Sequence, residues 1–266
     1  MVFRVISYNL LHSRALEELV GIVANDPDLD ALALQEVHAH ALPERIGHLR
    51  LAEHTRRNQL AIAIYYRHER LELLGTRTFA LKRAVHDMMF EQRSPERLVG
   101  VHLRAYASGR ELILGSIHAA PLTSRNALRR KQIADAHELL STLSETAPVL
   151  MVGDFNYPMF HNRLGERLNR SGYDLVLSDK RTYQSLKLIR GHFDFVTGRG
   201  IEILGVETLR KGRSDHYPIL VTAQAVDPAA DLARPLSERS LPTGPLSERS
   251  ESKGHRRPSS RLRRDR

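Results

Sequence analysis

The sequence predicts a domain of the α/β (α+β) class over residues 1–226. Short runs of apolar and β-branched residues alternate along this part of the chain with segments whose apolar residues recur at the three- and four-residue steps of a helix. Several predicted strands also end in a polar side chain where the next loop begins, which is typical of layered domains that hold ligands at strand ends. A hydrophobic fraction of 41% in 266 residues is sufficient for a sizeable core.

The first third of the chain is predicted to form two strands around one helix. Residues 4–8 form the first strand, and Ser13 is expected to cap the helix that follows. Asn25-Asp26-Pro27 ends that helix, since proline cannot continue it. Residues 31–35 are expected to form a buried strand that leads into Glu36. The apolar residues at helical spacing are Leu16, Leu19, Val20 and Val23.

The middle of the chain is predicted to form three further strands, over residues 61–66, 98–105 and 111–118. The turn residues Ser108 and Gly109 join the last two strands into a hairpin. The third strand ends at His118, so this region adds another polar residue at a strand end.

The last part of the domain is predicted to alternate helices and strands. A long helix over residues 126–143 precedes an apolar strand at 149–153, which runs into Asp154. A shorter helix follows, and late strands are expected at 194–196 and 219–223. The apolar residues that define the two helices are Ile133, Ala136, Leu140 and Leu143 in the first, and Phe160, Leu164 and Leu168 in the second.

A different composition begins at Asp227. The apolar periodicity ends there, and the segment Pro-Leu-Ser-Glu-Arg-Ser occurs at 235–240 and again at 245–250. Such a composition cannot bury enough surface to offset the entropy of ordering, so residues 227–266 are predicted to be a disordered basic tail. The arginines of residues 261–266 are compatible with loose phosphate binding, but a passive extension is the favoured interpretation.

Composition excludes several classes of protein. The absence of cysteine excludes disulfides, thiol nucleophiles, cysteine zinc sites and iron–sulfur clusters. No apolar run has the roughly 18 residues of a membrane span, and Ser7 interrupts the N-terminal apolar run too early for a secretory signal. We therefore expect a cytoplasmic monomer without a membrane span. The net charge of +9 divides into +4 for the tail and +5 for residues 1–226, which suits a polyanionic partner but is also explained by surplus surface arginine.

Carboxylates and neutral polar side chains recur at the ends of the predicted segments. Carboxylate oxygens are hard ligands that suit Mg²⁺, Mn²⁺ or Ca²⁺, whereas a zinc site more often contains paired His or Cys. Histidines beside such an ion can donate to phosphoryl oxygens or move protons. Together these groups indicate hydrolysis at phosphorus. The residues are the carboxylates Glu36, Asp154, Asp194 and Asp215, with Asn9, Asn156, His118 and His216.

The order of these residues resembles that of the endonuclease/exonuclease/phosphatase superfamily, and its deoxyribonuclease I-like members most closely. Each short motif that contains one of these residues is weak evidence alone, but six such motifs in the same order, from Asn9 to His216, are specific evidence for the resemblance. The resemblance implies a four-layered sandwich in which two central mixed β-sheets are flanked by helices. The motifs are Asn9 in SYNL, Glu36 in LQEV, His118 in IHAAP, Asp154 and Asn156 in GDFN, Asp194 in FDF, and Asp215 and His216 in SDHYP.

The resemblance also implies the role of each residue. Glu36 would bind Mg²⁺ directly, with Asp215 close to the same ion and Asn9 supporting that corner; Mn²⁺ is a substitute. Asp154, helped by Asn156, would orient or deprotonate the attacking water.

The two histidines would act on the phosphoryl group. His216, oriented by Asp194, would hydrogen-bond one phosphoryl oxygen or act as acid or base, and His118 would stabilise the opposite oxygen. One departure concerns His118, because deoxyribonuclease I-like members have a glutamate partner where this chain has Asn58-Gln59-Leu60.

Simpler interpretations exist for each residue alone. Asn9 and Glu36, taken alone, are explained as ordinary residues at strand ends. Asp154 and Asn156 are explained by a local Asx turn, and the two histidines by a structural role in the core. Their joint occurrence in order argues against these interpretations. The basic start of the long helix, at residues 125–131, is predicted to be a solvated face rather than a nucleic-acid contact. The loop at residues 83–97 is predicted either to bury its apolar triplet or to form a lip over the site.

The function predicted from these observations is Mg²⁺-dependent hydrolysis of phosphodiester bonds by in-line water attack, with nucleic acid as the substrate and a DNA endonuclease or exonuclease favoured. The alternative is a phosphatase or phosphodiesterase acting on a lipid head group or an inositol phosphate. A non-catalytic nucleic-acid-binding module is a third hypothesis, which loss of a metal or water-positioning residue would favour; none of these is lost. The sequence does not distinguish a DNA substrate from an RNA substrate, or endonucleolytic from exonucleolytic cleavage.

Overall fold

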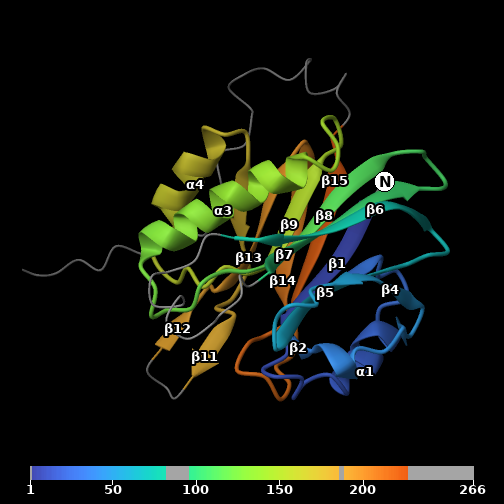
Figure 1. The fold of residues 1–266 in the computed structure, drawn as a ribbon, viewed down its shortest axis with the longest axis horizontal. Helices are drawn as coiled ribbons and strands as arrows, with labels where there is room; N and C mark the ends of the chain where they lie inside the picture. The colour runs from blue at the N-terminus through green and yellow to red at the C-terminus, as the bar shows by residue number, and fades with distance from the viewer. Residues whose placement is uncertain (1, 82–95, 186–188, 227–266) are drawn as a thin grey trace, which may run out of the picture.

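Two large β-sheets pack face to face in the computed structural model, which describes residues 2–81, 96–185 and 189–226 (Figure 1). The predicted tail at 227–266 and most of the loop at 83–97, with its apolar triplet, lie outside the described residues. No helix in the described part of the chain is long and apolar enough to cross a membrane.

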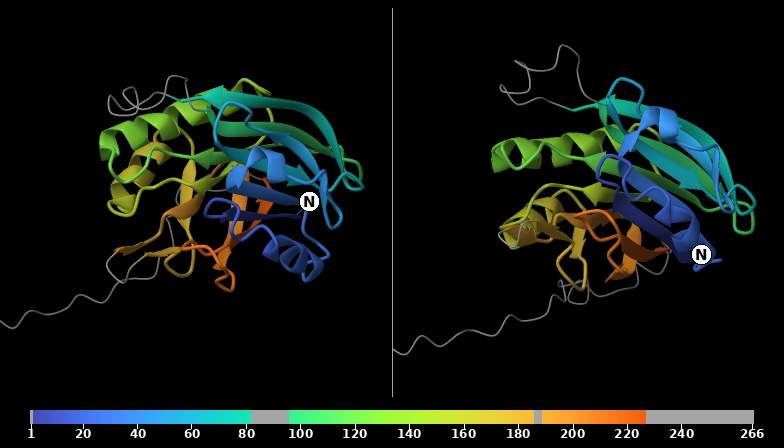
Figure 2. Two further views of the ribbon diagram at one scale, coloured as in Figure 1. Left: turned by 60° about the horizontal axis from the view of Figure 1, so that its bottom comes forward. Right: turned by 90° about the horizontal axis from the view of Figure 1, so that it is seen from below.

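The first sheet has seven strands in the order β14-β15-β1-β2-β5-β4-β3. It is mixed, because β1 and β2 are parallel whereas the other neighbours are antiparallel. The C-terminal strands, orange in Figure 2, lie beside the blue N-terminal strand. The strands are β1 (Val2–Asn9), β2 (Ala31–His38), β3 (Arg45–Ile46), β4 (Leu49–His54), β5 (Leu60–Tyr66), β14 (Ile201–Thr208) and β15 (Ile219–Ala225).

The second sheet has six strands in the order β10-β13-β9-β8-β7-β6. It is also mixed, with β8 and β9 parallel. The strands β11 (Tyr183–Ser185) and β12 (Ile189–Gly191) form a separate antiparallel pair. The strands of the sheet are β6 (Leu71–Ala80), β7 (Glu96–Ala105), β8 (Glu111–His118), β9 (Val149–Asp154), β10 (Asp174–Leu177) and β13 (Asp194–Arg199).

Helices cover the outer faces of the two sheets. The helices α3 (Asn126–Ser141) and α4 (His161–Asn169) pack on the six-stranded sheet, whereas α1 (Glu18–Ala24) packs on the seven-stranded sheet (Figure 1). A short 3-10 helix, η1 (Ala39–Ala41), follows β2. A third apolar cluster, which includes Val5, Val101 and Val152, fills the space between the sheets. The predicted four-layered sandwich is confirmed.

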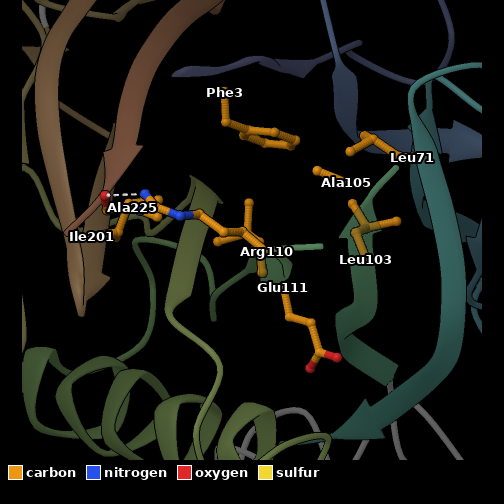
Figure 3. Close-up of a pocket in the computed structure, with 9 residues that line it drawn as sticks. Phe3, Leu71, Leu103, Ala105, Arg110, Glu111, Ile201 and Ala225 are labelled. Carbon is orange, nitrogen blue, oxygen red and sulfur yellow. Dashed lines mark hydrogen bonds between the residues drawn. The ribbon is translucent and has the colours of Figure 1, made fainter. Parts of the chain in front are cut away.

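An apolar pocket opens at one end of the core between the sheets, at the start of β1 and the end of β7 (Figure 3). Its volume is about 20 Å³, which is room for little more than one water molecule. Arg110 closes one side by donating from Nη1 to the carbonyl oxygen of Ala225 at 3.4 Å. This pocket is therefore a minor packing defect rather than a binding site.

All of the predicted strands and helices are present, but several details differ from the predictions. Ser13 does not cap α1, which begins at Glu18; its Oγ accepts a hydrogen bond from the backbone N–H of His38 at 2.8 Å. Phe160 is not on the buried face of α4, because it precedes the helix with φ of +66° and is 55% exposed. Arg129 is buried rather than solvated, since its Nη1 donates to the carbonyl of Pro121 at 2.6 Å.

Candidate functional site

The predicted polar residues converge at the other end of the sandwich, around a pocket of about 410 Å³. They come from both sheets, because β1, β2, β8 and β9 carry them to the same edge. Asn9 and Asp194 lie behind the pocket wall and are hydrogen-bonded to residues that line it. The predicted residues that line the pocket directly are Glu36, His118, Asp154, Asn156, Asp215 and His216.

Asp154 is the centre of the cluster. Its Oδ1 accepts a hydrogen bond from the backbone N–H of Asn156 at 2.9 Å, and its Oδ2 accepts one from Nδ2 of Asn9 at 3.1 Å. The Nε2 atoms of His118 and His216 each lie 3.7 Å from the same Oδ2. Burial raises the pKa of Asp154, while the nearby histidines oppose that rise. A buried carboxylate between two imidazoles is suited to accept a proton from water.

His216 is held by Asp194. Its Nδ1 donates to Oδ2 of Asp194 at 2.8 Å, so Nε2 faces the pocket. Burial opposes protonation of the ring, but the carboxylates of Asp194 and Asp154 outweigh burial and raise the pKa of His216 to about 10. The two carboxylates therefore favour the protonated form of His216, whose Nε2–H is directed into the site.

His118 has different surroundings. Burial lowers its pKa to about 4, and Arg97 adds to that effect. Among the described residues, no carboxylate pairs with Nδ1 of His118; the Nε2 atom lies 3.7 Å from Oε1 of Glu36 and from Asp154. Asn58, which stands in the expected place of a glutamate partner, instead bonds the backbone of Glu96 through both side-chain atoms.

Glu36 reaches the pocket through an irregularity in β2. The register with β5 shifts between Leu34 and Val37, and Glu36 has a φ of +55°, so the strand does not end at Glu36 as predicted but continues past it. Such a bulge redirects one side chain without ending the strand. Oε1 of Glu36 accepts Nδ2 of Asn9 at 3.1 Å. Oε2 lies 3.4 Å from Nε2 of His12.

The loop after β1 supports this corner of the site. Leu11, His12 and Ser13 have φ values of +46°, +56° and +66°, a strained run for non-glycine residues. The Oδ1 atom of Asn9 accepts the N–H of Leu11 at 3.1 Å, and the N–H of Ser13 donates to the carbonyl of Glu36 at 2.9 Å. Asn9 thus directs its amide nitrogen at the carboxylates of Glu36 and Asp154.

The donor set suits a hard cation. Glu36 and Asp215 present carboxylate oxygens to the same pocket from different segments, and oxygen ligands are those that Mg²⁺ and Mn²⁺ prefer. In the described part of the chain, the carboxylate and imidazole groups of Asp154, Asp194 and His216 form a cluster whose potential ligand atoms lie within 4.8 Å of one another. Asp194 and His216 are hydrogen-bonded to each other, so these two residues form a pair that holds a proton beside Asp154.

The residues that hold these side chains in place were not predicted from the sequence. Oγ of Ser214 donates to the carbonyl of Asn9 at 2.7 Å and accepts the N–H of His216 at 3.1 Å, which ties the last loop to β1. Oγ1 of Thr182 accepts the N–H groups of Phe193 and Asp194, both at 3.0 Å. Ser214 lies within the motif that contains Asp215, and that was its only signal in the sequence.

The sheets are also joined by a buried polar contact behind the site. Nε2 of Gln35 donates to Oγ of Ser116 at 3.0 Å and to Oγ of Ser7 at 3.3 Å. Gln35 belongs to β2 and Ser116 to β8, so this contact holds the two sheets in register beneath the pocket.

Other residues complete the wall of the pocket. The loop at Ala120 and Pro121 is held by α3, since Oε1 of Gln132 accepts the N–H of Ala120 at 2.8 Å and Arg129 donates to Pro121. Arg97 lines the side of His118, and Tyr183 and Phe193 line the side of His216. The geometry therefore provides a carboxylate, two imidazoles of different charge and oxygen donors for a cation in one pocket.

Comparison with known proteins agrees with this geometry. The sequence model of the Endonuclease/Exonuclease/phosphatase family matches residues 6–216. No curated protein matches the chain in sequence. Several solved structures share the fold at low identity.

Three of these structures illustrate the range of relatives. The human Nocturnin catalytic domain with bound sulfate is 14% identical, with a TM-score of 0.68 over 85% of this chain and 95% of that chain. D. rerio TDP2, complexed with a single-strand DNA product, is 18% identical, with a TM-score of 0.65 over 84% and 99%. A mannosyl-6-phosphatase from Bacteroides thetaiotaomicron is 17% identical, with a TM-score of 0.62 over 83% and 99%.

Proposed function

Because the chain belongs to the Endonuclease/Exonuclease/phosphatase family, we propose that it is a divalent-metal-dependent hydrolase that cleaves phosphodiester bonds in nucleic acid. Members of this family are phosphoesterases. The observation that carries the proposal is the position of the buried Asp154, which lies 3.7 Å from both His118 and His216. A carboxylate that can accept a proton and two imidazoles that can donate to phosphoryl oxygens, gathered around one point, are suited to hydrolysis at phosphorus.

Each residue has a role that follows from its surroundings. Asp154 orients the attacking water and accepts its proton, because its raised pKa makes the carboxylate a better base. His216, charged and fixed by Asp194, donates from Nε2 to a phosphoryl oxygen. His118 faces the opposite oxygen. Water attacks phosphorus in line with the leaving oxygen, so one P–O bond forms as the other breaks, and the departing oxygen takes up a proton to give the alcohol.

A cation belongs to the same proposal. Mg²⁺ or Mn²⁺ held by Glu36 and Asp215 would stabilise negative charge on the phosphoryl oxygens. Asn9 supports the ligand arrangement, because its amide nitrogen holds Oε1 of Glu36 in place. The strained loop after Asn9 fixes that amide in turn.

Nucleic acid is favoured as the substrate by charge. Residues 1–226 carry a net charge of +5, and Arg97 adds a cation to the pocket wall. A structural relative, D. rerio TDP2, is described with a single-strand DNA product. A second candidate is a phosphatase or phosphodiesterase for a lipid head group or inositol phosphate. A pocket of about 410 Å³ can enclose a small phosphoester, and another structural relative is a mannosyl-6-phosphatase.

The test compares substrates for the full-length protein. Supercoiled plasmid, labelled DNA and RNA oligonucleotides and inositol phosphates are incubated with Mg²⁺, Mn²⁺ or a chelator at low and moderate salt. We expect metal-dependent cleavage of nucleic acid that weakens steeply with salt, and its loss in Glu36→Gln. Turnover of small phosphoesters alone, with intact nucleic acid, would favour the second candidate. Cleavage that persists in excess chelator would refute metal dependence.

A further inference from the structure

The two sides of the catalytic pocket have different chemistry. Arg97 lies opposite His118 across the β7–β8 ladder, one position beyond the pair Leu98 and Ile117, and its Nη1 is 3.5 Å from the carbonyl oxygens of His118 and Ala119. On the other side, the ring of Tyr183 lies 4.7 Å from that of His216. One side therefore presents a cation and the other an aromatic ring.

The aromatic side is a supported surface. The Tyr183 ring lies 4.4 Å from the ring of Phe193, at an angle of 38°. Phe193 is only 1% exposed, so it backs Tyr183 from the core, whereas Tyr183 itself is half-buried and lines the pocket. Tyr183 therefore contributes an aromatic side chain to the wall of the pocket, beside His216.

Backbone hydrogen bonds hold this surface against the catalytic groups. Tyr183 forms an isolated bridge with His216, and the N–H of Gln184 donates to the carbonyl of Asp215 at 3.1 Å. Phe193 immediately precedes Asp194, and Thr182 accepts the N–H groups of both. The ring therefore stays at a set distance from the phosphate-binding imidazole.

A substrate that uses both sides carries a planar aromatic group next to its phosphodiester. A nucleobase has this character, and bases stack on tyrosine rings with little dependence on sequence. Lipid head groups and inositol rings have no π face to offer. Within a duplex, both faces of each base are already occupied by neighbouring bases, so only an unstacked base can pack on Tyr183.

We infer that Tyr183, backed by Phe193, is a stacking subsite for the nucleobase adjacent to the scissile phosphate, and that the protein therefore cleaves unpaired nucleotides in preference to duplex. This inference rests on the proposed function and specifies its substrate class. Tyr183 acts as a specificity-determining residue: it stacks on the base and leaves the reacting atoms to the imidazoles and Asp154.

The test measures kcat and KM on one labelled oligonucleotide as a single strand, as a duplex, and with an abasic residue beside the cleaved bond. The wild-type protein is expected to favour the single strand over the duplex by at least about tenfold. Tyr183→Leu is expected to lower kcat/KM on the single strand by about 5- to 160-fold, the effect of losing one stacked base, mainly through KM. Tyr183→Phe, which keeps the ring, is expected to restore it.

The abasic substrate separates stacking from structural damage. If Tyr183 contacts the base, the effects on kcat/KM of removing the base and of removing the ring are not additive. Tyr183→Leu then lowers kcat/KM much less on the abasic strand than on the intact strand. Tyr106→Leu is the matched control, because Tyr106 is 61% exposed and follows the far end of β7.

The outcomes are distinguishable. Equal cleavage of single strand and duplex, or an equal loss in Tyr183→Leu on intact and abasic strands, overturns the inference and leaves the proposed function in place. A folded protein that cleaves no oligonucleotide overturns both.

Discussion

Gly153 precedes Asp154, and its replacement by alanine tests how the site is positioned. Gly153 has a φ of +140°, and it pairs with Ile117 of β8 on one side and Phe195 of β13 on the other. An added Cβ would lie 2.1 Å from the carbonyl oxygen and 2.9 Å from the nitrogen of Ile117. Both contacts are with backbone, so no side chain can rotate away to make room.

The expected cost follows from these two effects. A non-glycine residue in a rarely populated backbone region costs about 1–3 kcal/mol, and overpacking inside a core costs about 1–3 kcal/mol more. The sum is about 2–6 kcal/mol, a large part of the roughly 5–15 kcal/mol stability of a domain. At about 2–4 °C per kcal/mol for this size, Gly153→Ala is expected to lower the Tm by roughly 5 to 20 °C.

The assay is thermal unfolding followed by circular dichroism, with a second glycine as the control. Gly75 lies within a strand, β6, but a Cβ there would meet nothing within 4 Å. Gly75→Ala is expected to change the Tm by less than about 2 °C. Equal shifts in the two variants, or a Gly153→Ala protein as stable as wild type, would refute the steric reasoning.

Three other substitutions test separate parts of the account. Asp194→Asn removes the charge that holds His216 as an imidazolium, so kcat should fall about 10- to 100-fold while the fold, followed by circular dichroism, is retained; an unchanged kcat at pH 7 contradicts that role. Burial lowers the pKa of His137 to about 3, so the unfolded chain binds this proton below about pH 6.5 and the folded protein does not. The free energy of unfolding therefore decreases as the pH is lowered, by about 2 kcal/mol from pH 7.5 to pH 5. Urea titrations should show a smaller decrease over the same pH range in His137→Phe. Arg129→Met removes a buried donor to Pro121, which should cost about 1.5–3 kcal/mol in urea unfolding; an unchanged midpoint contradicts it.

Much of the site is predictable because strand ends leave a clear pattern in the sequence. Asn9, His118 and Asp154 each follow an apolar run, and the structure places all three at the end of a strand and at one edge of the sandwich. The family resemblance predicted that Asp194 and His216 act together, and they are hydrogen-bonded at 2.8 Å. Periodicity alone does not show that pairing.

Other features depend on backbone geometry that composition does not reveal. The bulge at Glu36 needs a left-handed φ at a residue with no sequence tendency toward it. Ser13 resembles a helix cap, but tertiary contact with His38 takes its hydroxyl. The strands β6 and β14 were not predicted, since most of their residues are half-buried or exposed and each contains a bulge at a glycine, Gly75 or Gly205.

The most direct test of the central claim is the rate of oligonucleotide hydrolysis in Mg²⁺ by Asp154→Asn. This substitution keeps the size of the side chain but removes the carboxylate that lies between His118 and His216. If Asp154 activates the water, kcat falls by at least about 100-fold in a protein that unfolds as cooperatively as wild type. A kcat within threefold of wild type would contradict the account.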